Sequence, residues 1–191
     1  PMNPQTSLRP REAPEPHRVT GEDGLAMQAA GLLLEGGKFE LIDGAIIDLP
    51  SEASAHLELK AVLNRYLARR LPDDIGLVPD GTLRLAERLW PEPDLYLYPA
   101  SMLAADVRGP DTLLVIEIAD TTLAYDLGAK AERYRQHGVR EYWVIDVVAR
   151  QTHVHLLHGA WPMDPRGFDA KLSPTLLGGL SLRLSDIERR R

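Results

Sequence analysis

From about residue 20 onward, apolar and polar positions recur with the periods of short helices and strands. Before that point the chain has five prolines and no apolar period, so we expect a disordered tail over residues 1–19 and a single domain over residues 20–191. The string TGED that begins at Thr20 places an acid three residues after a hydroxyl, which predicts a capping box. The helix that follows is expected to reach Leu34 and to end at Gly36-Gly37.

The next part of the chain predicts a hairpin, a longer helix and two strands. The string KFELIDGAIIDLP is typical of two short strands around the turn pair Asp43-Gly44. Ser51 is expected to cap a helix that runs to about Arg70, because an apolar stripe follows it and Leu71-Pro72 then stops it. Short strands are expected near 76–79 and 82–86.

Strand patterns dominate the second half of the chain. DLYLY follows the stiff segment Pro91-Glu92-Pro93, and LLVIEIA is a nearly continuous apolar run typical of a central buried strand. A helix is expected from about residue 123 to Gly138, then strands at EYWVID and THVHLL, and one more near 179–184. This order of elements predicts an α/β protein with a mixed sheet.

Glu117 is the most informative residue, because it interrupts LLVIEIA, where every neighbour argues for burial on both faces of a sheet. An unpaired carboxylate there would be strongly destabilising or would have to become neutral. A metal ion, a basic side chain or an array of backbone donors must therefore compensate it. The alternative is that Glu117 sits at a frayed strand end or forms a structural ion pair with an arginine.

Asp94 strengthens the interpretation of Glu117 as a site residue. It opens DLYLY directly after two prolines, and the two acids fall at corresponding ends of strands that should be neighbours. Two carboxylates that meet there supply hard oxygen ligands, which suit Mg²⁺ or Mn²⁺. Taken alone, Asp94 is better explained as an ordinary strand-start or turn aspartate.

Lys130 is the candidate cation of this site. It lies one turn from Asp126 on the expected helix, beside the apolar stripe, so that its ammonium could reach the sheet near Glu117. The alternative is a simple ion pair between Asp126 and Lys130, worth a few tenths of a kcal/mol. The chain has 18 arginines and only four lysines, a bias that fits either a lysine kept for its ammonium or codon usage. Lys60, on another helix, is expected to matter little.

Composition narrows the classes of function. The chain has no cysteine, which excludes disulfides and thiolate metal sites. No apolar run approaches the length of a membrane span, so we expect a soluble, cytoplasmic protein. The net charge of −6 argues against a general polyanion-binding surface, but DNA stays open as a substrate because metal ions would offset the site carboxylates.

Three strings taken together resemble the Uma2 family, a branch of the PD-(D/E)XK nuclease superfamily: PEPDLYLYP, LVIEIADTT and YDLGAKAERYRQHGVREYWVID. KFELIDGAIIDLPSEASAH also matches, and the resemblance runs from about residue 20 to 157, more loosely to the end. It implies a restriction-endonuclease-like sheet flanked by helices, a divalent metal held by Asp94 and Glu117, and phosphodiester hydrolysis. It makes Glu40 a candidate third acid, and Lys130 the replacement for the strand lysine of the superfamily.

Two positions depart from the pattern of these relatives. Ala119 stands two residues after Glu117, where the superfamily motif has lysine. Asp120 stands where the relatives usually have a small hydroxyl residue, and its negative charge would either recruit a second metal or spoil the geometry. Both departures favour a rival reading in which the site is degraded.

Histidines and aromatic residues carry weaker signals. His153 and His155 alternate on a strand and could bind a transition metal, but no third ligand is obvious, so an exposed strand face is expected. His56 is a minor candidate for supporting the site from a helix start. Tyr142 and Trp143 are expected in the core or at a dimer interface rather than as base-stacking platforms.

The sequence therefore predicts a metal-dependent phosphodiesterase, a DNA endonuclease. Asp94 and Glu117 would hold Mg²⁺ or Mn²⁺, Lys130 would stabilise the phosphate or orient water, and Glu40 would support the metal. A homodimer is expected, because cutting both strands of a duplex calls for two sites. The main rival is a non-catalytic binding or scaffolding protein that keeps the fold. A third possibility is an unrelated α/β protein in which Glu117 pairs with an arginine.

Overall fold

The computed structural model describes residues 16–33, 39–48, 53–159, 161 and 164–189. Helix α1 (Gly21–Ala29) begins with the predicted capping box: the hydroxyl of Thr20 accepts a hydrogen bond from the Asp23 N–H at 3.1 Å, and the Asp23 carboxylate accepts one from the Thr20 N–H at 2.8 Å. The helix ends at Ala29, earlier than predicted, and Gly31 follows with a φ of 69°. The predicted stop at Gly36-Gly37 lies outside the described residues.

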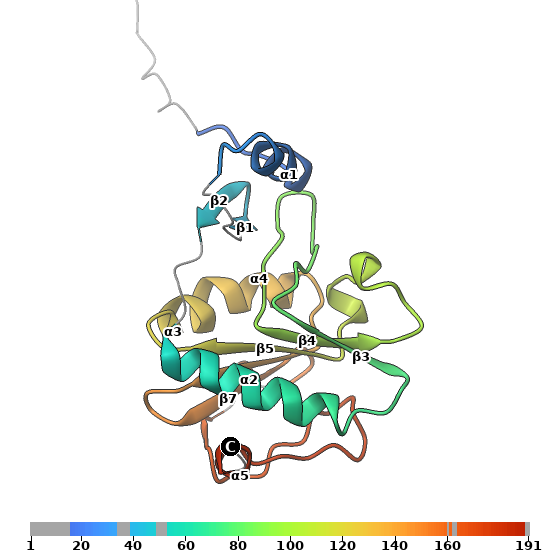
Figure 1. Cartoon of the computed structure of the whole chain (residues 1–191), viewed down its shortest axis with the longest axis vertical. Coiled ribbons are helices and arrows are strands. Elements are labelled where there is room, and N and C mark those ends of the chain that lie inside the picture. The colour runs from blue at the N-terminus through green and yellow to red at the C-terminus, as the bar shows by residue number, and fades with distance from the viewer. Residues whose placement is uncertain (1–15, 34–38, 49–52, 160, 162–163, 190–191) are drawn as a thin grey trace, which may run out of the picture.

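Strands β1 (Phe39–Ile42) and β2 (Ala45–Asp48) form the predicted antiparallel hairpin. Its turn residues Asp43 and Gly44 have φ values of 52° and 77°, as a two-residue turn of this kind requires. The hairpin and α1 stand together above one face of the main sheet (Figure 1). Backbone hydrogen bonds between Leu41 and Trp90 connect the hairpin to the loop before β4.

In the described part of the chain, the main sheet has six strands in the order β3-β4-β5-β6-β7-β8, of which only the β5–β6 pair is parallel. The sheet is therefore mixed, as predicted. Its strands span Ile75–Pro79 (β3), Leu95–Pro99 (β4), Leu114–Ala119 (β5), Glu141–Asp146 (β6), Gln151–Leu156 (β7) and Arg166–Gly167 (β8).

Helices cover both faces of this sheet (Figure 1). Helix α2 (Ser54–Ala68) packs on one face, together with α5 (Leu184–Glu188). The other face carries α3 (Leu123–Tyr125), a π-helical turn η3 (Asp126–Lys130) and α4 (Ala131–Gln136). Two short 3-10 turns, η1 (Ala104–Asp106) and η2 (Gly109–Asp111), lie in the loop between β4 and β5.

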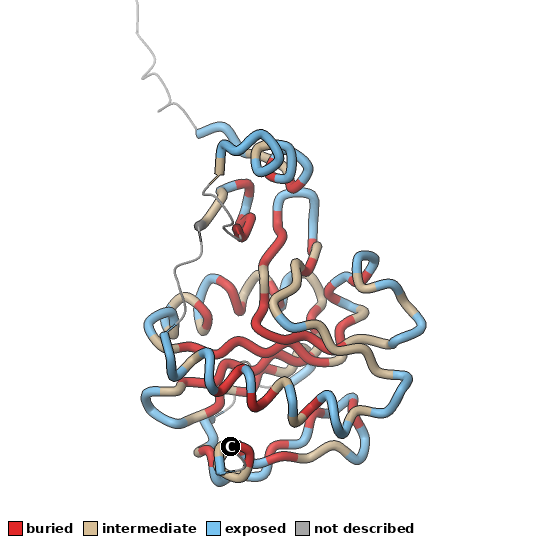
Figure 2. The backbone as a smooth tube through the Cα atoms, in the orientation of Figure 1, coloured by how far each residue is buried: buried red, intermediate tan, exposed pale blue. Residues whose placement is uncertain are grey.

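The alternation of side chains along β5 explains why the sheet is covered twice. Ile116 and Ile118 pack toward α2, whereas Val115 and Ala119 pack toward α4 and its residue Tyr134. Figure 2 shows the result as a continuous buried layer through the central strands. Within the described residues, no helix has the length and apolar character needed to cross a membrane.

Several predicted boundaries are wrong. Helix α2 begins at Ser54 with Ala53 at its N-cap, not at Ser51. The segment 82–86 forms no named strand, apart from one isolated bridge between Ala86 and Leu89. Its buried leucines pack in the cluster that also holds Ile42 of the hairpin, which explains their strand-like alternation. Near 179–184 the chain forms only a single bridge, Leu172 with Leu182, before α5 starts.

Candidate active site

Antiparallel pairing of β4 with β5 brings Asp94 beside Glu117. Leu95 lies opposite Ile116 in this register, so the residue before β4 falls next to the residue after Ile116. The Asp94 Oδ2 atom accepts a hydrogen bond of 2.7 Å from the backbone N–H of Ile118, which fixes this carboxylate at the end of β5. Both acids are buried, with exposed fractions of 7% for Asp94 and 5% for Glu117.

Lys130 supplies the cation that compensates Glu117. Its Nζ lies 2.8 Å from Glu117 Oε1, and the hydroxyl of Tyr134 donates a 3.0 Å hydrogen bond to the same oxygen. Glu117 is therefore embedded in its strand and not at a frayed end. Among the described residues its ion-pair partner is this lysine and not an arginine.

Glu40 joins the cluster from the hairpin. Its Oε1 atom accepts a 2.7 Å hydrogen bond from Lys130 Nζ and another of 2.8 Å from the backbone N–H of Glu92. The residue is 1% exposed, although a hairpin of this kind normally leaves alternate residues in solvent. Lys130 therefore links the hairpin to the central strand of the main sheet.

A π-helical turn carries Lys130 to this position. The N–H of Ala131 donates to the carbonyl of Asp126, five residues back, where an α-helix would use the fourth. Turns of this kind are frequent at functional sites. Lys130 forms no ion pair with Asp126 within the described part of the chain, so the simple surface pair considered as an alternative is wrong. Asp126 instead accepts a hydrogen bond of 2.5 Å from the Thr122 hydroxyl.

Helix α2 brings two further residues to Asp94. The Nε2 atom of His56 lies 2.7 Å from Asp94 Oδ1, and Lys60 Nζ lies 3.4 Å from the same oxygen. Lys60 also donates a 2.7 Å hydrogen bond to Asp80. Lys60 therefore lies beside the acid pair, which was not predicted from the sequence. The signal that could have revealed it is the spacing of His56 and Lys60, one turn apart on the helix face that packs on the sheet.

The charges shift the pKa values of these residues in different directions. Burial raises the pKa of Glu117 well above its usual range; Lys130 partly offsets this, while the neighbouring carboxylates of Asp94, Asp126 and Glu40 add to it. Burial likewise disfavours the charged form of Asp94, but His56, the Ile118 N–H and Lys60 outweigh it, so the pKa of Asp94 is lowered. Asp94 is thus the more strongly ionised member of the pair.

Burial alone would lower the pKa of Lys130, but the surrounding carboxylates of Glu117, Glu40 and Asp126 outweigh it and raise that pKa. The lysine therefore stays charged. Among the described residues, Lys130 pairs with Glu117 and Glu40, and Lys60 pairs with Asp94 and Asp80, while Asp126 pairs with neither lysine. The cluster keeps an excess of negative charge in a buried setting.

This donor set fits a divalent cation. Both described donors to Glu117 meet its Oε1, so no described donor reaches Oε2. Within the described ranges no three acidic or histidine side chains converge as a complete cage. A cation would therefore use the Asp94 and Glu117 carboxylates together with water and substrate oxygens. Mg²⁺ sites in proteins commonly combine one or two carboxylates with such oxygens.

The remaining candidates lie apart from the carboxylates or play other parts. Ala119 is fully buried against the α4 side of the sheet. His155 is also fully buried, between the rings of Tyr142 and Trp161, so the prediction of an exposed strand face is wrong for it. Tyr142 and Trp143 are core residues, as one of the two expectations had it.

A mixed sheet with helices on both faces and an acid–lysine cluster at one end is the architecture of a nuclease-like α/β protein. A crystal structure from Anabaena variabilis, described as "a putative nuclease belonging to DUF820", superposes with a TM-score of 0.66 at 17% identity. The alignment covers 90% of this chain and 98% of that one, and at this identity it establishes the fold. No curated protein matches the sequence.

The sequence profile of the Uma2 family, described as "Putative restriction endonuclease", matches residues 25–185. The chain therefore belongs to the Uma2 family. Both the fold class and the family resemblance predicted from the sequence are confirmed.

Proposed function

We propose that this protein is a metal-dependent endonuclease that hydrolyses phosphodiester bonds in DNA, with Asp94 and Glu117 holding Mg²⁺ or Mn²⁺. The observation that carries the proposal is the position of Lys130, whose buried ammonium contacts Glu117 at 2.8 Å and Glu40 at 2.7 Å. An acid pair with a neighbouring ammonium supplies the charges that phosphodiester hydrolysis requires. Membership of a family described as restriction endonucleases supports the same activity.

Each side chain has a defined part in this mechanism. Lys130 stabilises the negative charge that develops on the phosphate, or orients the attacking water. Tyr134 holds Glu117 in place through its hydroxyl, and His56 with Lys60 does the same for Asp94. Glu40 positions Lys130 and would support a bound metal. A divalent cation, when bound, polarises the phosphate and lowers the pKa of a bound water.

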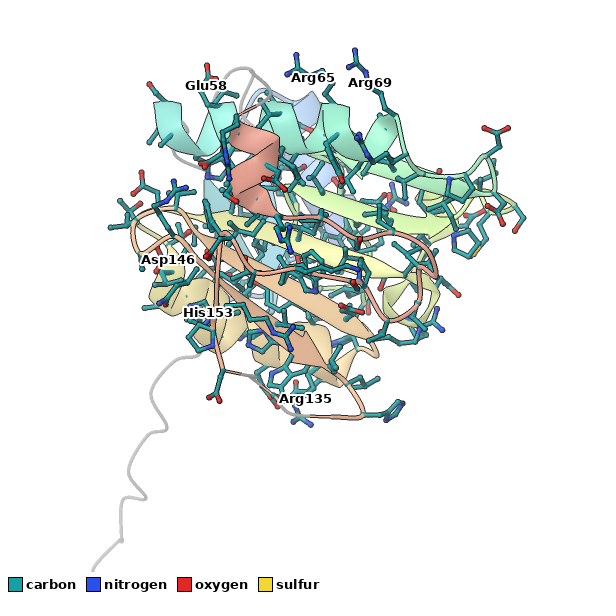
Figure 3. All side chains as sticks on the ribbon, turned by 90° about the horizontal axis from the view of Figure 1, so that it is seen from below. Glu58, Arg65, Arg69, Arg135, Asp146 and His153 are labelled. Carbon is teal, nitrogen blue, oxygen red and sulfur yellow. The ribbon has the colours of Figure 1, made fainter. Side chains whose placement is uncertain are left out.

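The surface of α2 supports a nucleic-acid substrate despite the net charge of −6. Figure 3 shows Arg65 and Arg69 on the outer side of this helix, pointing away from the sheet. Arg70 follows them and stacks on the ring of Tyr66 at 3.9 Å. Because α2 also carries His56 and Lys60 at its other end, phosphates that contact these arginines would lie on the helix that leads to the acids.

A cleavage assay tests the function. Purified protein with Mn²⁺ should nick or degrade duplex or single-stranded DNA, and Asp94→Asn should abolish this while keeping the fold. Asp73→Asn is the matched control, because Asp73 is exposed and lies in the loop after α2. Metal binding without cleavage of duplex, single-stranded or modified DNA would reject the enzyme and favour the scaffolding protein.

We also propose a homodimer with two-fold symmetry, since one chain offers one acid pair and a duplex has two strands to cut. Sedimentation equilibrium of the purified protein tests this. A monomer that still makes double-strand breaks at a single encounter would contradict it.

A further inference from the structure

Tyr125 is a polar side chain at the site that the mechanism above does not use. It ends α3, directly before the π-helical turn that carries Lys130. Its hydroxyl oxygen is buried and has no hydrogen-bond partner within the described structure. Buried hydroxyls nearly always have a partner, because leaving one without it loses the hydrogen bonds it would make to water.

The surroundings of this hydroxyl are those of the acid cluster. Glu40, Lys130, Arg133 and Asp126 all lie near enough for their charges to affect its pKa. Burial and then Glu40 raise the pKa of Tyr125 to about 12, so the group remains an O–H donor throughout the neutral range. What it lacks is an acceptor.

The two neighbouring cations are already engaged with other groups. The ammonium of Lys130 contacts Glu40 and Glu117. The guanidinium of Arg133 donates to the carboxylate of Asp43 and, at 2.7 Å, to the carbonyl of Ala129. An incoming group must therefore provide lone pairs, and an anion that displaces the carboxylates would meet the two cations beside it.

We propose that Tyr125 binds the substrate by donating its hydroxyl hydrogen to a non-bridging oxygen of the phosphate beside Lys130. The inference rests on the proposed nuclease function and names a residue of the same site. A phosphate oxygen is a strong acceptor and carries the negative charge that the Lys130 and Arg133 side favours. A metal ion would not fill the role, because it offers no lone pair to a donor.

Tyr125→Phe isolates this contact, since it removes one oxygen and keeps the ring. The probe is a short single-stranded DNA oligonucleotide with Ca²⁺ in place of Mn²⁺, so that binding is measured without cleavage. We expect its Kd to rise roughly ten- to a hundredfold, the range for a lost hydrogen bond to a charged group. The melting temperature without DNA should stay the same or increase, because no internal hydrogen bond is lost. With Mn²⁺, kcat/KM should fall by a similar factor.

Tyr98→Phe is the matched control, because Tyr98 is half-buried near the far end of β4 and should bind DNA as wild type does. A Kd for Tyr125→Phe within twofold of wild type would overturn the proposal, as would a wild type that does not bind the oligonucleotide. If wild type binds the oligonucleotide but never cleaves DNA, and Tyr125→Phe still weakens binding, the Tyr125 contact is supported and the proposed nuclease activity is rejected.

Discussion

The ammonium of Lys130 lies 2.8 Å from the Oε1 atom of Glu117, although the two residues come from a helical turn and a strand. The strand itself carries Ala119 two positions after Glu117, where its side chain is buried among apolar neighbours. The cation beside the central acid is thus provided from the layer above the sheet. This places its charge between two carboxylates, Glu117 and Glu40, and makes it sensitive to the position of the hairpin.

The first prediction concerns the metal. Mg²⁺ or Mn²⁺ should raise the melting temperature of wild-type protein, because the ion binds the folded acid pair and not the unfolded chain. Asp94→Asn should lose this response, whereas the exposed-site variant Asp73→Asn should keep it. Differential scanning fluorimetry with and without each ion measures both. An equal increase in the wild type and Asp94→Asn would place the metal elsewhere.

The second prediction concerns Glu117 in metal-free protein. Burial raises its pKa, so the folded state favours the protonated acid, and the free energy of unfolding falls as the pH rises above the ordinary value of 4.5 and through the raised pKa. Glu117→Gln cannot ionise, and Lys130 keeps Glu40 as its partner. At pH 8 the variant should therefore be at least as stable as wild type, with a smaller advantage near pH 4.

Urea unfolding in EDTA between pH 4 and pH 8 tests this, with the exposed Glu58→Gln as the control. Clear destabilisation of Glu117→Gln at pH 8 would mean that the ion pair with Lys130 outweighs the cost of burying the carboxylate.

The third prediction concerns Lys130 in catalysis. Lys130→Ala should lower cleavage with Mn²⁺ by a factor on the order of a hundred, because a charge-stabilising group is lost. Metal binding should survive, since an ammonium is not a ligand. Lys130→Arg should restore little, because the guanidinium is wider and places its charge differently. Lys171→Ala, at an exposed lysine, is the control. Undiminished cleavage by Lys130→Ala would reject this role.

The fourth prediction concerns Lys60, which is 5% exposed beside Asp94 and Asp80. Lys60→Ala leaves these carboxylates without that cation, so it should destabilise the protein by about 2 kcal/mol. It should also weaken Mn²⁺-dependent cleavage, since Asp94 loses a group that fixes its position. Urea denaturation and the cleavage assay measure the two effects, again against Lys171→Ala. A variant as stable and active as wild type would remove Lys60 from the site.

The sequence by itself determined the features that depend on neighbouring residues. The capping box at Thr20 and the turn at Asp43-Gly44 were predictable because each is a local hydrogen-bond or dihedral requirement. The burial of Glu117 was predictable because its apolar flanks in β5 leave no solvent-facing side. The same kind of local pattern gave a wrong prediction of a strand at 82–86, where the alternating leucines pack in a cluster with Ile42 of the hairpin.

Only the tertiary structure decided which side chains meet. Glu40 and Lys130 form their 2.7 Å contact although they are 90 residues apart in the sequence. The hydrophobic pattern of neither segment predicts this contact. His56 and Lys60 reach Asp94 because α2 begins at the end of the sheet where β4 starts, a matter of how the layers are stacked. A hydrophobic pattern predicts that a face of a helix or strand is buried. Which residues it is buried against depends on how separate elements pack together, and the acid cluster consists of contacts between separate elements.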